Sequence, residues 1–168
     1  MLAVQTLRES LTYEPASGKL FWKQGCRHAG KEAGCITRTM QGNSYRLVRV
    51  NGKLVHAHRV AWAIVNGEWP PAMIDHKNGD GLDNRWSNLR PATREQNAQN
   101  RKLDQRSKTG ATGVHFNRRR NLYSVNIKAN GQRTHVGYFD TKDAAVVAAN
   151  QARARLHGGF ARQTHEVK

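Results

Sequence analysis

The stretch IDHKNGDGLDNRWSNLRPATREQNAQNR, residues 74–101, decides the fold at the centre of this chain. Asp75 and His76 stand at the end of a short apolar run, where a strand is expected to pass into a polar loop. The loop residues 78–81, Asn-Gly-Asp-Gly, tolerate positive φ, so the chain is expected to turn sharply directly after His76. A carboxylate and an imidazole are therefore expected at the rim of a tight loop.

The second half of this stretch predicts a return strand and a capped helix. Asn88 precedes a brief strand at residues 89–92. Thr93, followed three residues later by Gln96, matches a capping box and gives the next helix a definite start. Asn97 lies on that helix. The arrangement could bring one carboxylate, one imidazole and one amide oxygen around a single point.

These side chains suit the hydrolysis of a phosphodiester bond. His76 can deprotonate water, because the unperturbed pKa of an imidazole lies near working pH. A divalent cation suits the stabilisation of the phosphorus centre and of the departing 3′ oxygen, since it acts as a Lewis acid on phosphate oxygens. Mg²⁺ takes oxygen ligands, often one or two from the protein, and Asp75 with Asn97 would supply such a pair. Adjacent strand residues point to opposite sides, which separates the ligand Asp75 from the base His76.

The stretch resembles the ββα-metal motif of the HNH nucleases, in the variant with Asn as third motif residue that is common among phage homing endonucleases. The resemblance implies that His76 is the general base and Asp75 the carboxylate that precedes it. Asn88 matches the middle Asn, which hydrogen-bonds backbone to hold the loop, and Asn97 takes the third, metal-binding position. Because Asn is a harder ligand than His, one Mg²⁺ per active site is expected, with Mn²⁺ as a substitute, in preference to Zn²⁺. Asn100, one turn further on, remains an alternative to Asn97.

Two other kinds of metal site are not supported by the residue pattern. Cys26 and Cys35 have His28 between them, but a closed zinc site needs four ligands, usually with a CxxC-type pair. Two reduced cysteines in a cytoplasmic protein are the expectation instead. A calcium loop in the central stretch would need oxygen ligands where Lys77 and Gly79 stand.

The charge of the chain predicts a polyanionic partner. The 168 residues include 28 Lys and Arg against 12 Asp and Glu, a net charge of +16. Residues 101–168 hold 14 of the basic side chains and 4 of the acidic ones, so the excess is densest in the last part of the chain. No long apolar run or basic amphipathic helix with a bulky apolar face favours a membrane. Nucleic acid is therefore the expected partner.

The chain before the central stretch predicts hairpins followed by a helix. Asn51-Gly52 is the strongest short signal of a hairpin turn and joins two alternating runs. Helical spacing then replaces alternation, and Gly67 ends that helix. His56 and His58 are expected to be surface or packing residues. The expected elements are a helix at residues 2–11, strands at residues 19–23, 45–50 and 54–57, and a helix at residues 58–65, with no clear element at residues 24–44.

The last part of the chain predicts a small module of three strands and one helix. Asn130-Gly131 makes a hairpin turn between two alternating runs, and Thr141 caps the helix. By the period of 2 in a strand, Val125 and Val136 face this helix and their alternates face the open side of the sheet. The expected elements are strands at residues 114–116, 122–128 and 133–139 and a helix at residues 144–156.

The open side of this sheet is expected to be polar and basic. A three-stranded sheet can lie in the major groove of DNA, where Arg and Asn side chains reach base edges. RNA is a weaker expectation, because this face is predicted to lack the exposed aromatic side chains on which unpaired bases stack. The predicted DNA contacts are Arg101, Lys102, His115, Asn117, Arg118, Arg120, Asn126, Lys128, Arg133 and His135.

The same module resembles the Apetala or ethylene-response-factor DNA-binding domain of plants. The match runs through residues 112–115, 123–128 and 135–139 and the Ala-rich helix. That family often has Trp where His135 stands, and an Arg-rich first strand where this chain has His115 and Asn117. The resemblance therefore implies DNA binding but no particular target sequence.

These observations predict an α+β chain in which N-terminal β-hairpins and a helix lead into the ββα-metal motif, followed by a small three-stranded antiparallel sheet packed on one helix. The expected parts are an HNH nuclease domain at residues 1–101 with its core at about 72–101, a basic linker at residues 102–111, and an Apetala-like DNA-binding domain at residues 112–168.

The predicted function is metal-dependent, site-specific cleavage of double-stranded DNA of the homing type, by a monomer or weak dimer that nicks one strand per active site. No membrane partner is expected, and the expected location is the cytoplasm, that of the host cell if a phage encodes the chain. The alternative is a DNA-binding regulator that keeps the HNH scaffold without activity. The intact set of Asp75, His76 and Asn97 favours the enzyme, because binding alone does not require it.

Overall fold

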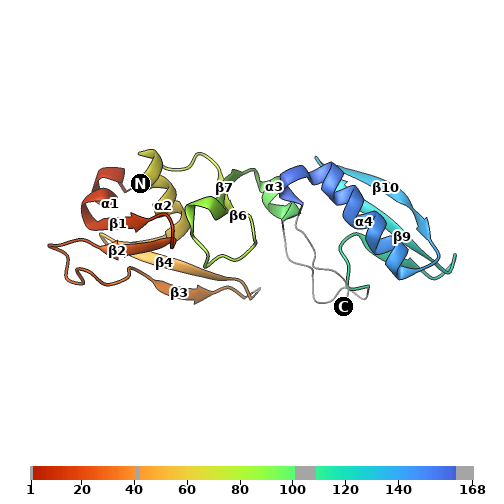
Figure 1. Cartoon of the computed structure of the whole chain (residues 1–168), viewed down its shortest axis with the longest axis horizontal. Coiled ribbons are helices and arrows are strands. Elements are labelled where there is room, and N and C mark those ends of the chain that lie inside the picture. Colours follow the sequence, from red (N-terminus) through yellow and green to blue (C-terminus); the bar gives the residue numbers. More distant parts are fainter. Residues whose placement is uncertain (1, 41, 101–108, 162–168) are drawn as a thin grey trace. The chain divides into compact units, whose positions relative to one another are not determined.

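The computed structural model describes residues 2–40, 42–100 and 109–161, and its elements confirm the expected α+β class. The chain divides into two compact units, Met1–Ala92 and Thr93–Lys168 (Figure 1). Among the described residues, two helices, a β-hairpin, a three-stranded sheet and a short two-stranded sheet build the first unit, whereas the second has a three-stranded antiparallel sheet packed on one helix. The domain boundaries expected from the sequence stay a prediction.

The first unit begins with a helix and a hairpin and continues into two further antiparallel sheets (Figure 1). Its elements are α1 (Val4–Ser10), β1 (Leu11–Glu14), β2 (Lys19–Trp22), β3 (Cys35–Arg38), β4 (Ser44–Val50), β5 (Lys53–His56), α2 (Ala57–Asn66), β6 (Met73–His76), a 3₁₀ turn (Trp86–Asn88) and β7 (Leu89–Ala92). Strands β1 and β2 pair with each other, β3, β4 and β5 form a sheet in that order, and β6 pairs with β7.

Local turn chemistry accounts for most of these boundaries. Asn51 has a φ of 45° in the predicted hairpin turn between β4 and β5. Gly67 has a φ of 80° and ends α2 in the left-handed conformation, as the sequence predicted. Strand β3 lies in a segment for which no element was expected, because its four residues are all exposed and show no apolar alternation.

The core of the first unit forms where α1, the sheets and α2 meet. Leu7, Val48 and Val60 are completely buried there, and burying each side chain of this kind stabilises the fold by roughly 1.5–3 kcal/mol. Ile74 of β6 and Leu89 of β7 belong to the same core. The short β6–β7 pair is therefore anchored to the body of the unit by one apolar residue from each strand.

The hairpin β1–β2 also holds the loop between β6 and β7. The Tyr13 hydroxyl donates a hydrogen bond of 2.7 Å to the backbone oxygen of Asn84, and the Trp86 amide donates one of 3.0 Å to the backbone oxygen of Pro15. Gly18 has a φ of 76° and lies so close that a Cβ added there would overlap backbone atoms of Asn84 and Arg85. Glycine is thus required at position 18 both by the conformation and by the close approach of the loop.

The second unit packs one long helix on a three-stranded sheet, and Figure 1 shows that helix running across β9 and β10. Its elements are α3 (Arg94–Gln99), β8 (Val114–Asn117), β9 (Leu122–Ala129), β10 (Gln132–Phe139), α4 (Lys142–His157) and a 3₁₀ turn (Gly158–Phe160). Val125 and Ile127 of β9 are buried against Ala145 and Ala149 of α4. The Thr141 side chain accepts a hydrogen bond from the Ala144 amide and caps α4, as predicted.

A β-bulge in β10 changes which side chains lie on the open face. The register with β9 shifts between His135, opposite Asn126, and Gly137, so that Tyr138 comes to lie opposite Ser124. The expected alternation puts Tyr138 on the helix side, but the extra residue places it with His135 on the open face. Its side chain is 40% exposed, and the expectation that this face lacks exposed aromatics is therefore wrong.

Alanine at position 18 is expected to destabilise the first unit far more than alanine at position 52. Both glycines have a φ of 76°, so both substitutions carry the cost of a left-handed alanine, roughly 1–2 kcal/mol. Gly52 has open space around its Cα, whereas Gly18→Ala must also push away the backbone of the β6–β7 loop. Chemical denaturation should give at least twice the loss of unfolding free energy for Gly18→Ala. Equal losses would show that the hairpin does not hold the loop.

Candidate active site

Asp75 and His76 are the last two residues of β6, and both are buried, with 5% of each residue exposed. In the antiparallel register with β7, Asp75 lies opposite Arg90 and His76 lies opposite Leu89. The short strand pair therefore fixes the backbone of both residues. Burial of two polar side chains in adjacent positions requires a partner for each of them.

Asp75 is paired with Arg90 across the two strands. The Arg90 Nε and Nη2 atoms lie 2.8 Å and 2.7 Å from Oδ2 of Asp75. The two side chains are 14% and 5% exposed, so this ion pair is shielded from solvent. The guanidinium compensates a carboxylate charge that burial alone would make very costly. Arg90 has no signal of this role in the sequence, because the pairing depends on the register of β6 and β7.

His76 is bound by Asn84 from the loop that follows β6. The His76 Nε2 atom lies 3.0 Å from Oδ1 of Asn84, and Asn84 is 3% exposed. An amide oxygen only accepts hydrogen bonds, so Nε2 carries the proton and donates. The other ring nitrogen, Nδ1, then has the lone pair with which an imidazole can take a proton from water. Sequence reasoning missed Asn84, since one Asn among several in a polar loop gives no signal of its own.

Two more histidines and a tyrosine surround the ring of His76. The ring of His58 lies edge-on to that of His76, with centroids 4.9 Å apart and planes at 87°, and stacks on His56 at 5.1 Å. Tyr45 contacts all three rings at 5.4–6.3 Å. Burial, together with the neighbouring His76, His56 and Arg59, lowers the pKa of His58 to about 3. Burial likewise lowers the pKa of His56, and both imidazoles are therefore neutral near pH 7.

Asn88 closes the loop between β6 and β7. Its Nδ2 donates to the backbone oxygen of Asp83 at 2.7 Å, and its Oδ1 accepts from the Asn78 amide at 3.1 Å. The Lys77 amide donates to the Asn88 backbone oxygen at 2.9 Å. Hydrogen bonds from Arg85 lower the pKa of Asp83 to about 2 and fix the middle of the loop. A single amide side chain thus ties together both ends of the turn that follows His76.

Asn97 and Asn100 belong to the second unit. Asn97 lies on α3, whose capping box has both expected hydrogen bonds. The Thr93 side chain accepts from the backbone N–H of Gln96, and the Gln96 side chain accepts from the backbone N–H of Thr93. Asn100 is the C-cap of this helix and is 4% exposed. The joint use of either amide with Asp75 stays a prediction. Within the described residues, no three His, Cys, Asp or Glu side chains are grouped closely enough to hold a metal ion.

Of the predicted DNA contacts, Arg101 and Lys102 lie outside the described residues. The other eight belong to β8, β9, β10 and the turn between β8 and β9. Of these, Asn117 and Asn126 are partly buried, and the rest are exposed. On the open face, His135 Nδ1 lies 3.2 Å from Oδ1 of Asn126, and the His135 ring contacts that of Tyr138 at 4.8 Å. The Arg120 guanidinium lies over the Tyr138 ring at 4.6 Å, a cation–π contact that orients this arginine.

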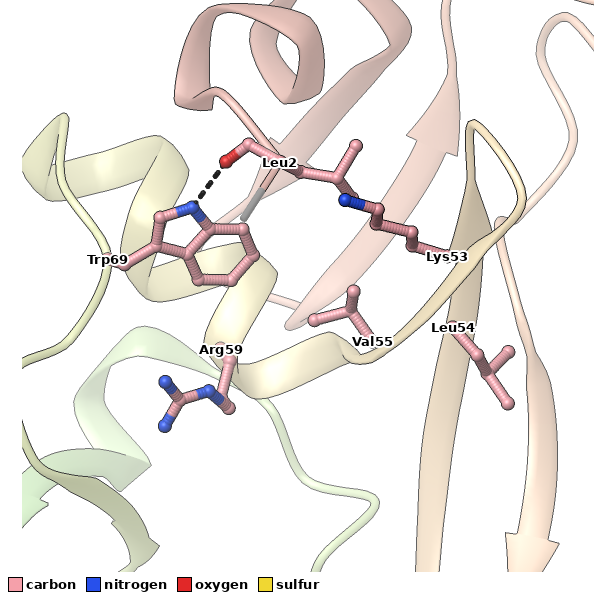
Figure 2. A pocket seen from close by; sticks show the side chains of 6 residues that line it. All are labelled: Leu2, Lys53, Leu54, Val55, Arg59 and Trp69. Carbon is pink, nitrogen blue, oxygen red and sulfur yellow. Dashed lines mark hydrogen bonds between the residues drawn. The ribbon is translucent and has the colours of Figure 1, made fainter.

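A separate groove of about 240 Å³ lies in the first unit, beside β5 and α2. Figure 2 shows the indole nitrogen of Trp69 donating to the backbone oxygen of Leu2 at its wall, a bond of 2.6 Å. The remaining lining residues are Lys53, Leu54, Val55 and Arg59. Neither Asp75 nor His76 lines this groove. Within the described part of the chain, no helix has the length and apolar character needed to cross a bilayer.

Comparisons with known proteins point to one family. The family model described as HNH endonuclease matches residues 55–99, which include Asp75, His76 and Asn88. Protein 3.8 of Escherichia phage T7 is 30% identical over 113 residues, which cover 66% of this chain and 91% of that protein. A solved structure entitled "DNA binding and cleavage by the HNH homing endonuclease I-HmuI" is 16% identical, covers 86% of this chain and 75% of its own, and has a TM-score of 0.39.

The buried His58 is expected to make the first unit less stable in acid. The pKa of His58 is about 3 in the folded protein and about 6.5 in the unfolded chain. At pH values between these two, the unfolded state therefore binds one more proton than the folded state. The contribution of the neutral His58 to the free energy of unfolding is fully present above pH 6.5 and is lost as the pH falls towards 3. His58→Phe, which keeps a ring but cannot titrate, should show a smaller drop in melting temperature between pH 7 and pH 4.

The matched control for this experiment is His28→Phe, because His28 is exposed. It should follow the wild-type curve. A His58→Phe variant that loses as much melting temperature on acidification as the wild type would contradict the expected role of His58.

Proposed function

Because the chain belongs to the family of Protein 3.8 of Escherichia phage T7 and carries an HNH endonuclease domain, we propose that it is a metal-dependent, site-specific endonuclease of double-stranded DNA. The observation that carries this proposal is the buried pair Asp75-His76 at the end of β6, inside the matched segment. The proposed enzyme is of the homing type and nicks one strand per active site, as a monomer or weak dimer. Its proposed location is the cytoplasm, that of the host cell if a phage encodes the chain.

His76 is the proposed general base. With Nε2 donating to Asn84, Nδ1 takes a proton from water, and the resulting hydroxide attacks the phosphorus. The bond to the 3′ oxygen breaks, this oxygen takes a proton from solvent water, and His76 releases its proton to solvent, which leaves a 5′-phosphate and a 3′-hydroxyl. Asn88 supports this geometry, because its hydrogen bonds hold the turn that starts at His76.

Asp75 and Asn97 are the proposed ligands of one Mg²⁺, for which Mn²⁺ can substitute, with Asn100 as the alternative to Asn97. A carboxylate and an amide oxygen fit this ion, since Mg²⁺ prefers oxygen ligands and often takes one or two from the protein. When bound, the cation would supply Lewis-acid stabilisation of the phosphate oxygens. The hydrogen bonds from Arg90 hold the Asp75 carboxylate in one orientation in the folded protein.

The open face of the β8–β9–β10 sheet is the proposed DNA-binding surface. It presents the predicted contacts His115, Asn117, Arg118, Arg120, Asn126, Lys128, Arg133 and His135, to which the bulge adds Tyr138. Arg101 and Lys102 are proposed to contact phosphates, and the resemblance to the Apetala domain supports the same surface. The high positive charge of residues 101–168 supplies affinity, and Arg and Asn side chains can read base edges.

One observation favours a second candidate, a DNA-binding regulator without catalysis. Arg90 already satisfies Oδ2 of Asp75, so a purely structural role for this carboxylate would also explain its burial. The two candidates differ in whether DNA is cut, and not in whether it is bound. RNA is a further competitor in binding experiments, because Tyr138 provides an exposed aromatic ring.

Cleavage of supercoiled plasmid carrying phage DNA, with Mg²⁺ present, tests the proposal. The wild type should convert it to open circles, and His76→Ala should be slower by about 10²–10⁴-fold, because a positioned general base contributes that much. Asp75→Asn should lose activity that added Mn²⁺ restores only in part. His28→Ala, at an exposed position, should cut like the wild type. If the wild type binds DNA but does not cut it in either Mg²⁺ or Mn²⁺, the nuclease proposal is wrong and the DNA-binding regulator is the remaining candidate.

Removing charge from the open face should weaken DNA binding without changing the fold. The double variant Lys128→Ala/Arg133→Ala removes two exposed cations from paired positions on β9 and β10. The slope of log affinity against log salt should fall by roughly 0.9 for each phosphate that the variant no longer neutralises. The matched control Lys142→Ala/Arg155→Ala removes two exposed cations from α4, which covers the opposite face. Equal reductions in both variants would mean that only net charge matters.

A further inference from the structure

Asn84 is the partner of His76, and its position in the structure is tightly determined. It lies in the loop between β6 and β7, is 3% exposed, and places Oδ1 at 3.0 Å from His76 Nε2. A buried amide side chain is costly unless it is hydrogen-bonded, so this contact also contributes to keeping the loop in its folded form. The bond joins two buried groups and is shielded from competition with water.

The acceptor nature of the amide oxygen determines the tautomer of His76. A neutral imidazole has one N–H donor and one lone-pair acceptor, and either nitrogen can take either role. An oxygen facing Nε2 stabilises the form with the proton on Nε2 and opposes the form with the proton on Nδ1. It also opposes rotation of the ring, because rotation would break the bond. Under the proposed mechanism, the nitrogen that takes a proton from water is then Nδ1.

Asn84 is in turn held by the N-terminal hairpin, far away in the sequence. The Tyr13 hydroxyl donates to the Asn84 backbone oxygen at 2.7 Å, and Tyr13 is 8% exposed. Burial, with a smaller effect of Asp83, raises the pKa of Tyr13 to about 12, so this hydroxyl remains a donor at all working pH values. The close approach of Gly18 leaves the Asn84 backbone no room to move towards the hairpin.

The other side of the His76 ring is also fixed. His58 packs edge-on against it, and Tyr45 lies 6.3 Å away between ring centroids. Packing of one ring against another restricts the imidazole but does not by itself distinguish its two nitrogens. The hydrogen bond with Asn84 does make that distinction, because it engages Nε2.

We propose that Asn84 is a positioning residue: its amide oxygen fixes the orientation and the Nε2–H tautomer of His76, and the β1–β2 hairpin holds Asn84 in place through Tyr13. The inference rests on the proposed role of His76 as general base. It gives the N-terminal hairpin a function in catalysis that acts through Asn84. Partners that orient metal-bound histidines in this way typically change activity by about 10–100-fold when removed, and a loss of similar size is expected for an oriented general base.

The test uses the full chain with ¹⁵N-labelled histidine and plasmid nicking in Mg²⁺. Asn84→Leu keeps nearly the same shape without an acceptor, Asn84→Asp keeps an acceptor oxygen, and Asn66→Leu is the control at an exposed helix end. The His76 nitrogen shifts of the wild type should report the Nε2–H tautomer, because Nε2 faces the amide oxygen of Asn84. Asn84→Leu should show a mixture of tautomers, whereas Asn84→Asp should retain the wild-type form.

In kinetics, Asn84→Leu should lower kcat by about 10–100-fold while KM for DNA stays within about twofold, because the DNA-binding surface is unchanged. Tyr13→Phe is the milder second variant and should lower kcat several-fold at constant KM, which keeps the test decisive if Asn84→Leu does not fold. Asn66→Leu should match the wild type. A wild-type Nδ1–H tautomer, or unchanged kcat in a folded Asn84→Leu variant, would overturn the inference.

The same experiments distinguish failure of the proposed nuclease function from failure of the proposed role of Asn84. If the wild type cuts no DNA in either cation, the nuclease proposal falls, and the nitrogen shifts alone then decide whether Asn84 sets the tautomer. If the wild type cuts and Asn84→Leu cuts equally well, the nuclease proposal stands and the positioning role of Asn84 is refuted.

Discussion

Burial of two adjacent polar side chains at the end of a four-residue strand is the constraint on which the centre of this molecule depends. Asp75 and His76 are each 5% exposed, and a buried polar group without a partner costs several kcal/mol. The surrounding structure supplies these partners, Arg90 for the carboxylate and Asn84 for the imidazole. Each partner needs support, so the antiparallel register fixes Arg90 and the loop and hairpin fix Asn84.

Local signals in the sequence were enough to predict the frame around this constraint. The hairpin turn at Asn51 and the end of α2 at Gly67 follow from backbone conformations that few residues adopt, and the capping box at Thr93 follows from side-chain bonds within one turn. The partners could not be predicted in this way. Tyr13 and Asn84 are 71 residues apart, and their contact exists only once the hairpin has packed against the loop.

The second unit shows a different limit of prediction from sequence. Alternation in β9 correctly identifies Val125 and Ile127 as the buried side of the sheet. In β10 a single bulge residue reverses the alternation, and Tyr138 joins the open face beside His135. Gly137 lies at this shift, and a glycine inside a strand is a signal of a bulge, but the register itself depends on the neighbouring strand. The result is a face that combines basic, amide and aromatic side chains.

The ion pair between Asp75 and Arg90 bears on how the proposed metal would be used. A buried carboxylate that depends on a cation for compensation would make folding depend on that cation, as in small structural metal sites. Here the guanidinium, fixed by the strand register, already compensates the charge in the folded chain. The free energy of binding a divalent ion at Asp75 would therefore add to the stability of a structure that is already formed. Under the proposed function, the β6–β7 pair and its loop preorganise the ligand and the base before either cation or DNA arrives.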